Sequence, residues 1–213
     1  MKRIAIWSGT IAILLLAVAG MIWAVKNSNN TESGDLAVPV SASDRMKGNP
    51  ESAITLVEYS DFQCPACKSY YPIVEKLMDE YGSKIRFVYR HFPLPQHTNA
   101  RPTAIAAEAA GNQGKFWEMH NMIFDHQTEW APLADSKDAL LSYAEALGLD
   151  KERFLQDFDS SELQKKVEDD LAGGMRSSVR GTPTFFLNGA AIANPLSYDE
   201  FKRAIDAAIT PAP

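Results

Sequence analysis

The chain contains only two cysteines, and both lie in the segment Cys64-Pro65-Ala66-Cys67, where a strand-like run meets a helix-like run. Two thiols held within one helical turn are better placed for thiol chemistry than for stapling a fold. A disulfide that closes so short a loop adds little stability, since its entropic benefit grows with loop length. The pair is therefore interpreted as redox-active, and the chain around it must fold so that these thiols can react.

Pro65, the first of the two residues between the cysteines, predicts where the helix begins. Proline suits the first position of a helix, where the missing N–H costs nothing, so Pro65 makes Cys64 the N-cap residue. A sulfur at this position lies close to the free N–H groups of the first turn and to the positive end of the helix dipole. Both favour the thiolate, and thiols in such motifs have pKa values of roughly 3.5 to 7. We expect Cys64 to be the nucleophile and the better shielded Cys67 to be the resolving thiol.

Two other interpretations of the pair are open. A structural zinc ion requires four ligands, but the chain has no second cysteine pair, and its four histidines lack a compact finger spacing. An inert structural disulfide is the other alternative. We expect neither, and we expect no metal and no cofactor other than the Cys64–Cys67 redox centre.

The N-terminus predicts a membrane segment. Ile4 to Val25 is an uncharged, mostly apolar run preceded by Lys2 and Arg3, and it is long enough to cross a bilayer as a helix. Residues 1–26 are thus predicted to be a retained single-pass anchor, with a cleaved signal peptide as the alternative. The leading basic charges favour a cytoplasmic N-terminus, which places the remaining chain outside the cytoplasm.

Residues 27–49 are rich in Asn, Ser, Gly and Asp and show no apolar periodicity, so a flexible tether is expected. The chain carries 21 basic and 27 acidic residues and has no basic patch. This charge balance argues against nucleic acid as a partner.

From residue 54 onward the chain alternates between strand and helix signals. Ile54–Ser60 and Ile85–Arg90 are predicted strands, and the segment between them is predicted to be helical up to Tyr81. A long stretch without strand character follows, with predicted helices at Thr103–Ala110, Phe116–Phe124, Ser136–Leu147 and Ser160–Met175.

The C-terminal part returns to strands. Thr184–Leu187 and Ala190–Ala193 flank Asn188-Gly189, a sequence typical of a tight hairpin turn. Tyr198–Ile209 is predicted to be the last helix. The predicted order is β-α-β, a helical insertion, and β-β-α.

Four segments in this order resemble the DsbA-like thiol-disulfide oxidoreductases, in particular their membrane-tethered bacterial branch. They are GNPESAITLVEYSDFQCPAC (48–67), VYRHFPLP (88–95), KFWEMH (115–120) and GTPTFFLNG (181–189). The resemblance implies an α/β thioredoxin fold with an inserted helical domain over the active site. The thioredoxin-fold domain would comprise residues 50–97 and 179–213, and the inserted domain residues 98–178.

The resemblance also implies roles for further residues. Thr182-Pro183 matches the family's cis-proline loop, which lies against the CxxC and presents backbone groups to a bound peptide. Glu58 matches a buried acid that accepts the proton of Cys67. Phe62 is expected to remain partly exposed beside the cysteines and to form a peptide-binding surface with Pro65 and Ala66.

The implied function is the introduction of disulfides into exported proteins, with a membrane quinone-linked partner as reoxidant and the protein acting as a monomer. A reductase or isomerase, and a membrane-tethered peptide-binding or chaperone module, are the alternatives. The Pro65-Ala66 dipeptide lacks the histidine of the most oxidising members, and Asp61 adds a negative charge nearby. We therefore expect a redox potential between those of thioredoxin and DsbA, roughly −270 to −120 mV.

Overall fold

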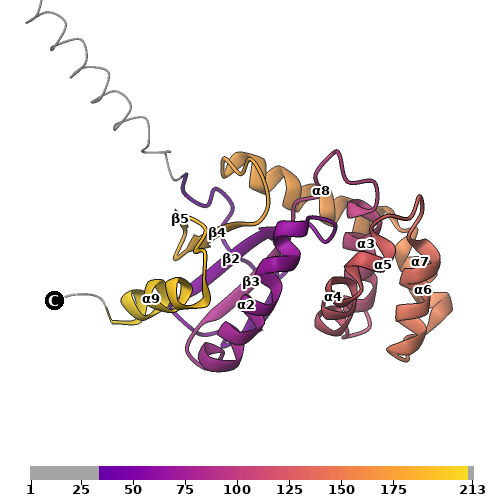
Figure 1. Ribbon diagram of the computed structural model, residues 1–213. Helices are drawn as coiled ribbons and strands as arrows, with labels where there is room; N and C mark the ends of the chain where they lie inside the picture. Colours follow the sequence, from indigo (N-terminus) through magenta and orange to yellow (C-terminus); the bar gives the residue numbers. More distant parts are fainter. Residues whose placement is uncertain (1–33, 211–213) are drawn as a thin grey trace, which may run out of the picture. The chain divides into compact units, whose positions relative to one another are not determined.

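The computed structural model describes residues 34–210. Its sheet has the strand order β1-β3-β2-β4-β5, in which β2 and β3 are parallel and all other pairs are antiparallel (Figure 1). The strands are β1 (Arg45–Gly48), β2 (Thr55–Ser60), β3 (Arg86–His91), β4 (Thr184–Leu187) and β5 (Ala190–Ile192).

The central strand β2 is buried on both faces, because every residue of its sequence TLVEYS is shielded from solvent. Leu56 packs into the larger core cluster, which also contains side chains of α2 (Pro65–Tyr81) and α9 (Tyr198–Ile209). Val57 points to the opposite face and joins a smaller cluster with Val88 and Phe186. The alternation of side chains along a strand thus divides the core into two layers.

The two helices that cover the larger cluster begin as their sequences predict. Pro65 occupies the first turn of α2 after the N-cap Cys64. At the start of α9 the Ser197 hydroxyl accepts a hydrogen bond from the Glu200 N–H, which satisfies one free donor of the first turn. Helix α9 therefore has the bounds that the sequence predicts.

Six helices lie between β3 and β4, all within the predicted insertion of residues 98–178 (Figure 1). They are α3 (Ala100–Gly111), α4 (Phe116–Asp125), α5 (Gln127–Trp130), α6 (Lys137–Ala146), α7 (Lys151–Phe158) and α8 (Ser161–Arg176). The four predicted helices of this region are present. The two that sequence analysis missed, α5 and α7, are short, and α7 has Phe154 as its one buried side chain. Helices with so few apolar residues show no recognisable hydrophobic periodicity in the sequence.

The predicted hairpin between β4 and β5 is confirmed. Asn188 and Gly189 have φ values of 52° and 88°. Two consecutive positive φ angles are what a tight type I′ turn requires, and Asn-Gly adopts them at low cost.

The prediction of a flexible tether up to residue 49 is wrong for its described part. β1 pairs with β3, and the carbonyl groups of Val38 and Pro39 accept hydrogen bonds from the buried Arg90 guanidinium. The charged side chains of β1 make its sequence resemble a linker. In the structure, Arg45 and Lys47 form ion pairs with acidic side chains on helices α3 and α2. A polar segment can therefore form an edge strand when each charge is matched by the surrounding structure.

The predicted anchor, residues 1–26, and the first part of the predicted tether lie outside the described residues. Within 34–210, the structure contains no helix with the length and hydrophobicity needed to cross a membrane.

Candidate active site

Cys64 and Cys67 lie at the start of α2, as the sequence predicts. Cys64 is the N-cap with an extended backbone (φ −70°, ψ 123°), and both cysteines are free thiols. The Cys64 side chain is 6% exposed and Cys67 is fully buried, whereas the intervening Pro65 and Ala66 are exposed. An incoming sulfur can therefore approach Cys64, while Cys67 is shielded.

The two thiols differ strongly in acidity. The pKa of Cys64 is lowered from 9.0 to about 5, chiefly by a hydrogen bond with the Cys67 thiol. Burial opposes this shift, and smaller contributions come from the Thr182 side chain and from the backbone N–H groups of Cys67 and Ala66. None of these N–H groups meets the geometry of a capping hydrogen bond to the sulfur. Burial, followed by the interaction with Cys64, raises the pKa of Cys67 well above its ordinary value. At neutral pH the reduced site therefore holds Cys64 as a thiolate and Cys67 as a protonated thiol.

The Thr182-Pro183 loop lies against Cys64. The peptide bond between these residues is cis, and the Cys64 Sγ lies 3.4 Å from the Thr182 carbonyl oxygen, to which the protonated thiol donates. The Thr182 hydroxyl is buried and has no hydrogen-bond partner within normal geometry among the described residues. The Asn194 side-chain amide donates to the Pro183 carbonyl oxygen over 2.6 Å, which ties this loop to the chain after β5.

A polar cluster lies behind Cys67. Glu58 on β2 is 4% exposed, and burial raises its pKa from 4.5 to about 7, with a smaller rise from the charge of Cys64 and an opposing effect of the Ser60 hydroxyl. Glu58 in turn raises the pKa of Cys67. Tyr89, which faces Glu58 in the register of β2 and β3, has a buried hydroxyl for which residues 34–210 provide no hydrogen-bond partner, and the same holds for Ser60. The predicted position of Glu58 as a buried acid beneath the cysteines is confirmed, and near pH 7 its carboxyl group can either donate or accept a proton.

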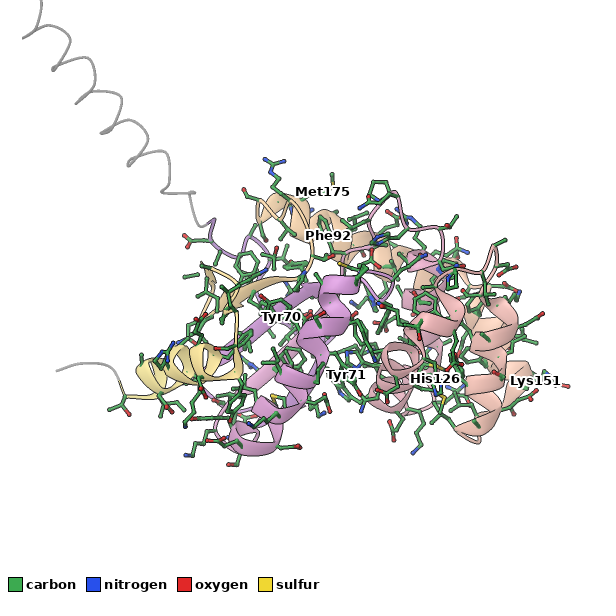
Figure 2. The ribbon with its side chains drawn as sticks, viewed as in Figure 1. Tyr70, Tyr71, Phe92, His126, Lys151 and Met175 are labelled. Carbon is green, nitrogen blue, oxygen red and sulfur yellow. The ribbon has the colours of Figure 1, made fainter. Side chains whose placement is uncertain are left out.

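The expectation that Phe62 forms part of an exposed surface is wrong. Its side chain is 1% exposed, stacks on Tyr89 at a centroid distance of 5.3 Å and contacts Phe124 of α4 at 4.9 Å. Figure 2 shows Tyr71 of α2 directed toward α4, where it stacks on the same Phe124 ring at 5.2 Å. Phe62 thus fills the junction between the sheet and the insertion, where a large apolar side chain gains more free energy than at the surface.

Sequence analysis also missed the side chains that hold the loop before Cys64. The buried Asp61 carboxylate accepts hydrogen bonds from the N–H groups of Gln63 and Leu94 and contacts His97 Nδ1 at 2.8 Å. It does not rank among the main influences on the pKa of Cys64. The Gln127 amide of α5 donates to the carbonyl oxygens of Phe62 and Cys64. No sequence signal links these positions, because they are far apart along the chain.

Among residues 34–210, no three His, Cys, Asp or Glu side chains are grouped so that they could hold a metal ion. His91 is buried, and its Nε2 lies 3.0 Å from Glu108 Oε1.

The comparisons with known proteins agree with this geometry. A family model described as Thioredoxin matches residues 41–207. A thioredoxin-like oxidoreductase from Silicibacter pomeroyi is similar in structure, with a TM-score of 0.68, 26% identity and coverage of 81% of this chain and 95% of that one. α-DsbA1 from Wolbachia pipientis (TM-score 0.72, 20% identity, 82% and 94% coverage) and oxidised BdbD from Bacillus subtilis (0.70, 24%, 83% and 97%) share the fold.

The curated relatives carry a different name. The Na⁺/H⁺ antiporter NhaA 1 of Salinispora arenicola is 46% identical over 157 residues, which is 73% of this chain and 23% of the relative. NhaA of Herminiimonas arsenicoxydans is 37% identical over 187 residues, 87% of this chain and 28% of the relative. The chain spans about a quarter of the length of these relatives, so their name describes proteins with much additional sequence. With a matching family model over most of its length, a cis-proline loop and a CxxC of unequal thiols, this chain belongs to the thioredoxin family.

Proposed function

We propose that the protein oxidises pairs of thiols in exported proteins through its Cys64–Cys67 disulfide. The observation that carries this proposal is the acidity of Cys64, whose pKa of about 5 makes it a thiolate at neutral pH. A stabilised thiolate favours the reduced form of the pair, and a protein whose reduced form is stabilised is an oxidant of other thiols.

The reaction begins with the oxidised pair. A substrate thiolate attacks the Cys64 sulfur, the Cys64–Cys67 bond breaks, and Cys67 leaves with the electron pair. Because the pKa of Cys67 is high, this sulfur takes up a proton, which the neighbouring neutral Glu58 donates. The second substrate thiol then loses its proton and attacks the substrate sulfur of the mixed disulfide. Cys64 leaves as a thiolate, the substrate has lost two electrons, and the protein is reduced.

Reoxidation reverses the role of Glu58. The Cys64 thiolate attacks a disulfide of a quinone-linked membrane partner, which gives a second mixed disulfide. Cys67 then attacks Cys64 and transfers its proton to Glu58, whose pKa of about 7 allows it to accept at neutral pH. The partner receives the two electrons.

The proposal places the site outside the cytoplasm, held to the membrane by residues 1–26, and acting as a monomer. Thr182 and the exposed Pro65 and Ala66 offer the surface on which an extended substrate segment binds beside Cys64. Cation transport is not part of the proposal, since the chemical groups assembled at the site are those of thiol exchange.

The pKa of Cys64 also supports an intermediate redox potential. It lies between the pKa values of about 7 for thioredoxin and about 3.5 for the strongly oxidising DsbA. We therefore retain a potential of roughly −270 to −120 mV as the expected range.

The test compares wild type with Cys64→Ser in two assays, oxidative refolding of a reduced disulfide protein and reduction of insulin, together with a redox titration against glutathione. We expect wild type to accelerate refolding and Cys64→Ser to be inactive. Faster insulin reduction without oxidative refolding would assign the protein to the reductases, and no difference between the variants in either assay would favour a binding module. Single-turnover kinetics of Glu58→Gln test the proton transfer, because unchanged resolution of a mixed disulfide would remove Glu58 from the mechanism.

A further inference from the structure

The loop that carries the nucleophile is held from the insertion by one buried amide. Gln127, on the short helix α5, is 6% exposed. Its Nε2 donates to the carbonyl oxygen of Phe62 over 2.6 Å and to that of Cys64 over 3.0 Å. One NH₂ group thus bridges two backbone carbonyls on either side of Gln63, directly before the catalytic helix.

The carbonyl of Cys64 has a second donor, the N–H of Lys68 at 3.1 Å, which is the first hydrogen bond of the helix. Two donors on one carbonyl fix the orientation of the peptide plane after Cys64, and with it the extended N-cap backbone. The direction of the Cα–Cβ bond follows from that backbone, so the donors also determine where the sulfur lies relative to the Thr182 carbonyl, 3.4 Å away.

The Gln63 side chain also connects the loop to the insertion, through two hydrogen bonds. The Gln63 amide donates to the carbonyl oxygen of Ala131, which follows α5, and its own carbonyl oxygen accepts from the Asn99 N–H over 2.7 Å. Residues of the insertion therefore contact the loop on both sides of Gln63. Gln127 differs from the others because it alone among these side chains contacts the nucleophile residue itself.

We propose that Gln127 is a positioning residue for thiol-disulfide exchange, which holds the Cys64 peptide group and thereby directs the sulfur of Cys64 toward the Thr182-Pro183 loop. The inference rests on the proposed function and adds to it a route by which the insertion acts on the reacting sulfur. The proposed effect of Gln127 on Cys64 acts through these two hydrogen bonds, since no hydrogen bond between the Gln127 side chain and either sulfur is found among residues 34–210.

The test uses the full chain with Gln127→Met, which keeps the side-chain length and removes the donor. Trp130→Phe is the control for a loss of stability in the same helix, because it removes buried volume and the hydrogen bond from Trp130 Nε1 to the Ile123 carbonyl oxygen, neither of which involves the carbonyl groups of Phe62 and Cys64. For each reduced protein, the thiolate absorbance is titrated with pH, the equilibrium with glutathione is measured, and thermal unfolding is recorded.

We expect Gln127→Met to shift the thiolate titration to higher pH, because a sulfur that is no longer held in place loses part of its alignment with the Cys67 thiol, the main group that lowers its pKa. The pair should then become easier to oxidise by glutathione disulfide, by up to about fivefold. This factor corresponds to ~1 kcal/mol, the contribution of one hydrogen bond, at 1.4 kcal/mol per tenfold change. Trp130→Phe should lower the unfolding temperature and leave both thiol measurements unchanged.

A Gln127→Met protein that is only less stable, with titration and glutathione equilibrium within twofold of wild type, would overturn the inference. If Gln127→Met does not fold, Gln127→Asn applies the same test, because it withdraws the amide from both carbonyls and keeps its polarity. The thiolate titration reports on Gln127 whichever way electrons flow, whereas failure of the proposed function appears only in the oxidation assays.

Discussion

Replacing Glu58 with glutamine should stabilise the reduced protein at alkaline pH while it slows the chemistry of Cys67. The carboxyl group is 4% exposed and sits beneath the thiol pair, where burial is the main cause of its raised pKa. Glutamine has nearly the same shape and cannot ionise, so the substitution removes the charge and little else.

The magnitude follows from the rise of the pKa from 4.5 to about 7. Because the folded state binds the proton more tightly than the unfolded state, stability is unaffected below pH 4.5, decreases as the pH rises toward 7, and stays reduced above it. At 1.36 kcal/mol per pH unit, the full penalty is about 3 kcal/mol. Glu58→Gln should therefore be more stable than wild type by up to about 3 kcal/mol at pH 8, with no difference attributable to this charge below pH 4.5.

The assay is denaturant unfolding of both reduced proteins at several pH values between 4 and 8, with Glu51→Gln as a control at an exposed position. The curves of wild type and Glu58→Gln should diverge as the pH rises through the interval from 4.5 to 7. Parallel curves over that whole interval would refute the argument that burial of this carboxyl group penalises its charge.

Three further substitutions test the contacts around the site and the sheet. Thr182→Val removes a hydroxyl that makes a minor contribution to the low pKa of Cys64 and forms no hydrogen bond of normal geometry among residues 34–210, so the thiolate titration should move upward by less than the ~0.7 pH unit (~1 kcal/mol) of a full hydrogen bond. An unchanged midpoint in the absorbance titration would show that the hydroxyl has no such effect. Phe62→Ala should destabilise the protein by about 3–5 kcal/mol in denaturant unfolding because it empties a fully buried position, and a loss below about 1 kcal/mol would contradict that burial. Asp44→Ala leaves the buried Arg90 guanidinium without its carboxylate and should cost about 3–5 kcal/mol; the double variant Asp44→Ala/Arg90→Met should recover part of this loss, and an equal or larger loss would count against the ion-pair explanation.

Features that depend on near neighbours in the chain could be predicted from the sequence. Pro65 determines where α2 starts and makes Cys64 its N-cap, and Asn188-Gly189 forms the predicted hairpin turn. These predictions succeed because backbone preferences of proline, asparagine and glycine act within a few residues. The cis bond before Pro183 came from the family resemblance, since its local sequence alone does not favour that isomer.

Features that depend on distant partners were decided by the tertiary structure. β1 is a strand because Arg45 and Lys47 meet acidic side chains on two helices, a match that composition cannot reveal. Phe62 is buried because its ring packs between Tyr89 of β3 and Phe124 of the insertion.

The reactivity of the site divides in the same way. The sequence by itself determined that two thiols share the first turn of a helix and that Glu58 precedes them on a strand. Only the tertiary structure decided that the Thr182 carbonyl, 118 positions along the chain, faces the Cys64 sulfur and that the Gln127 amide holds the Cys64 peptide group. The physical reason is that pKa values and orientation depend on burial and on hydrogen-bond partners, and both arise only when segments far apart in the chain pack together.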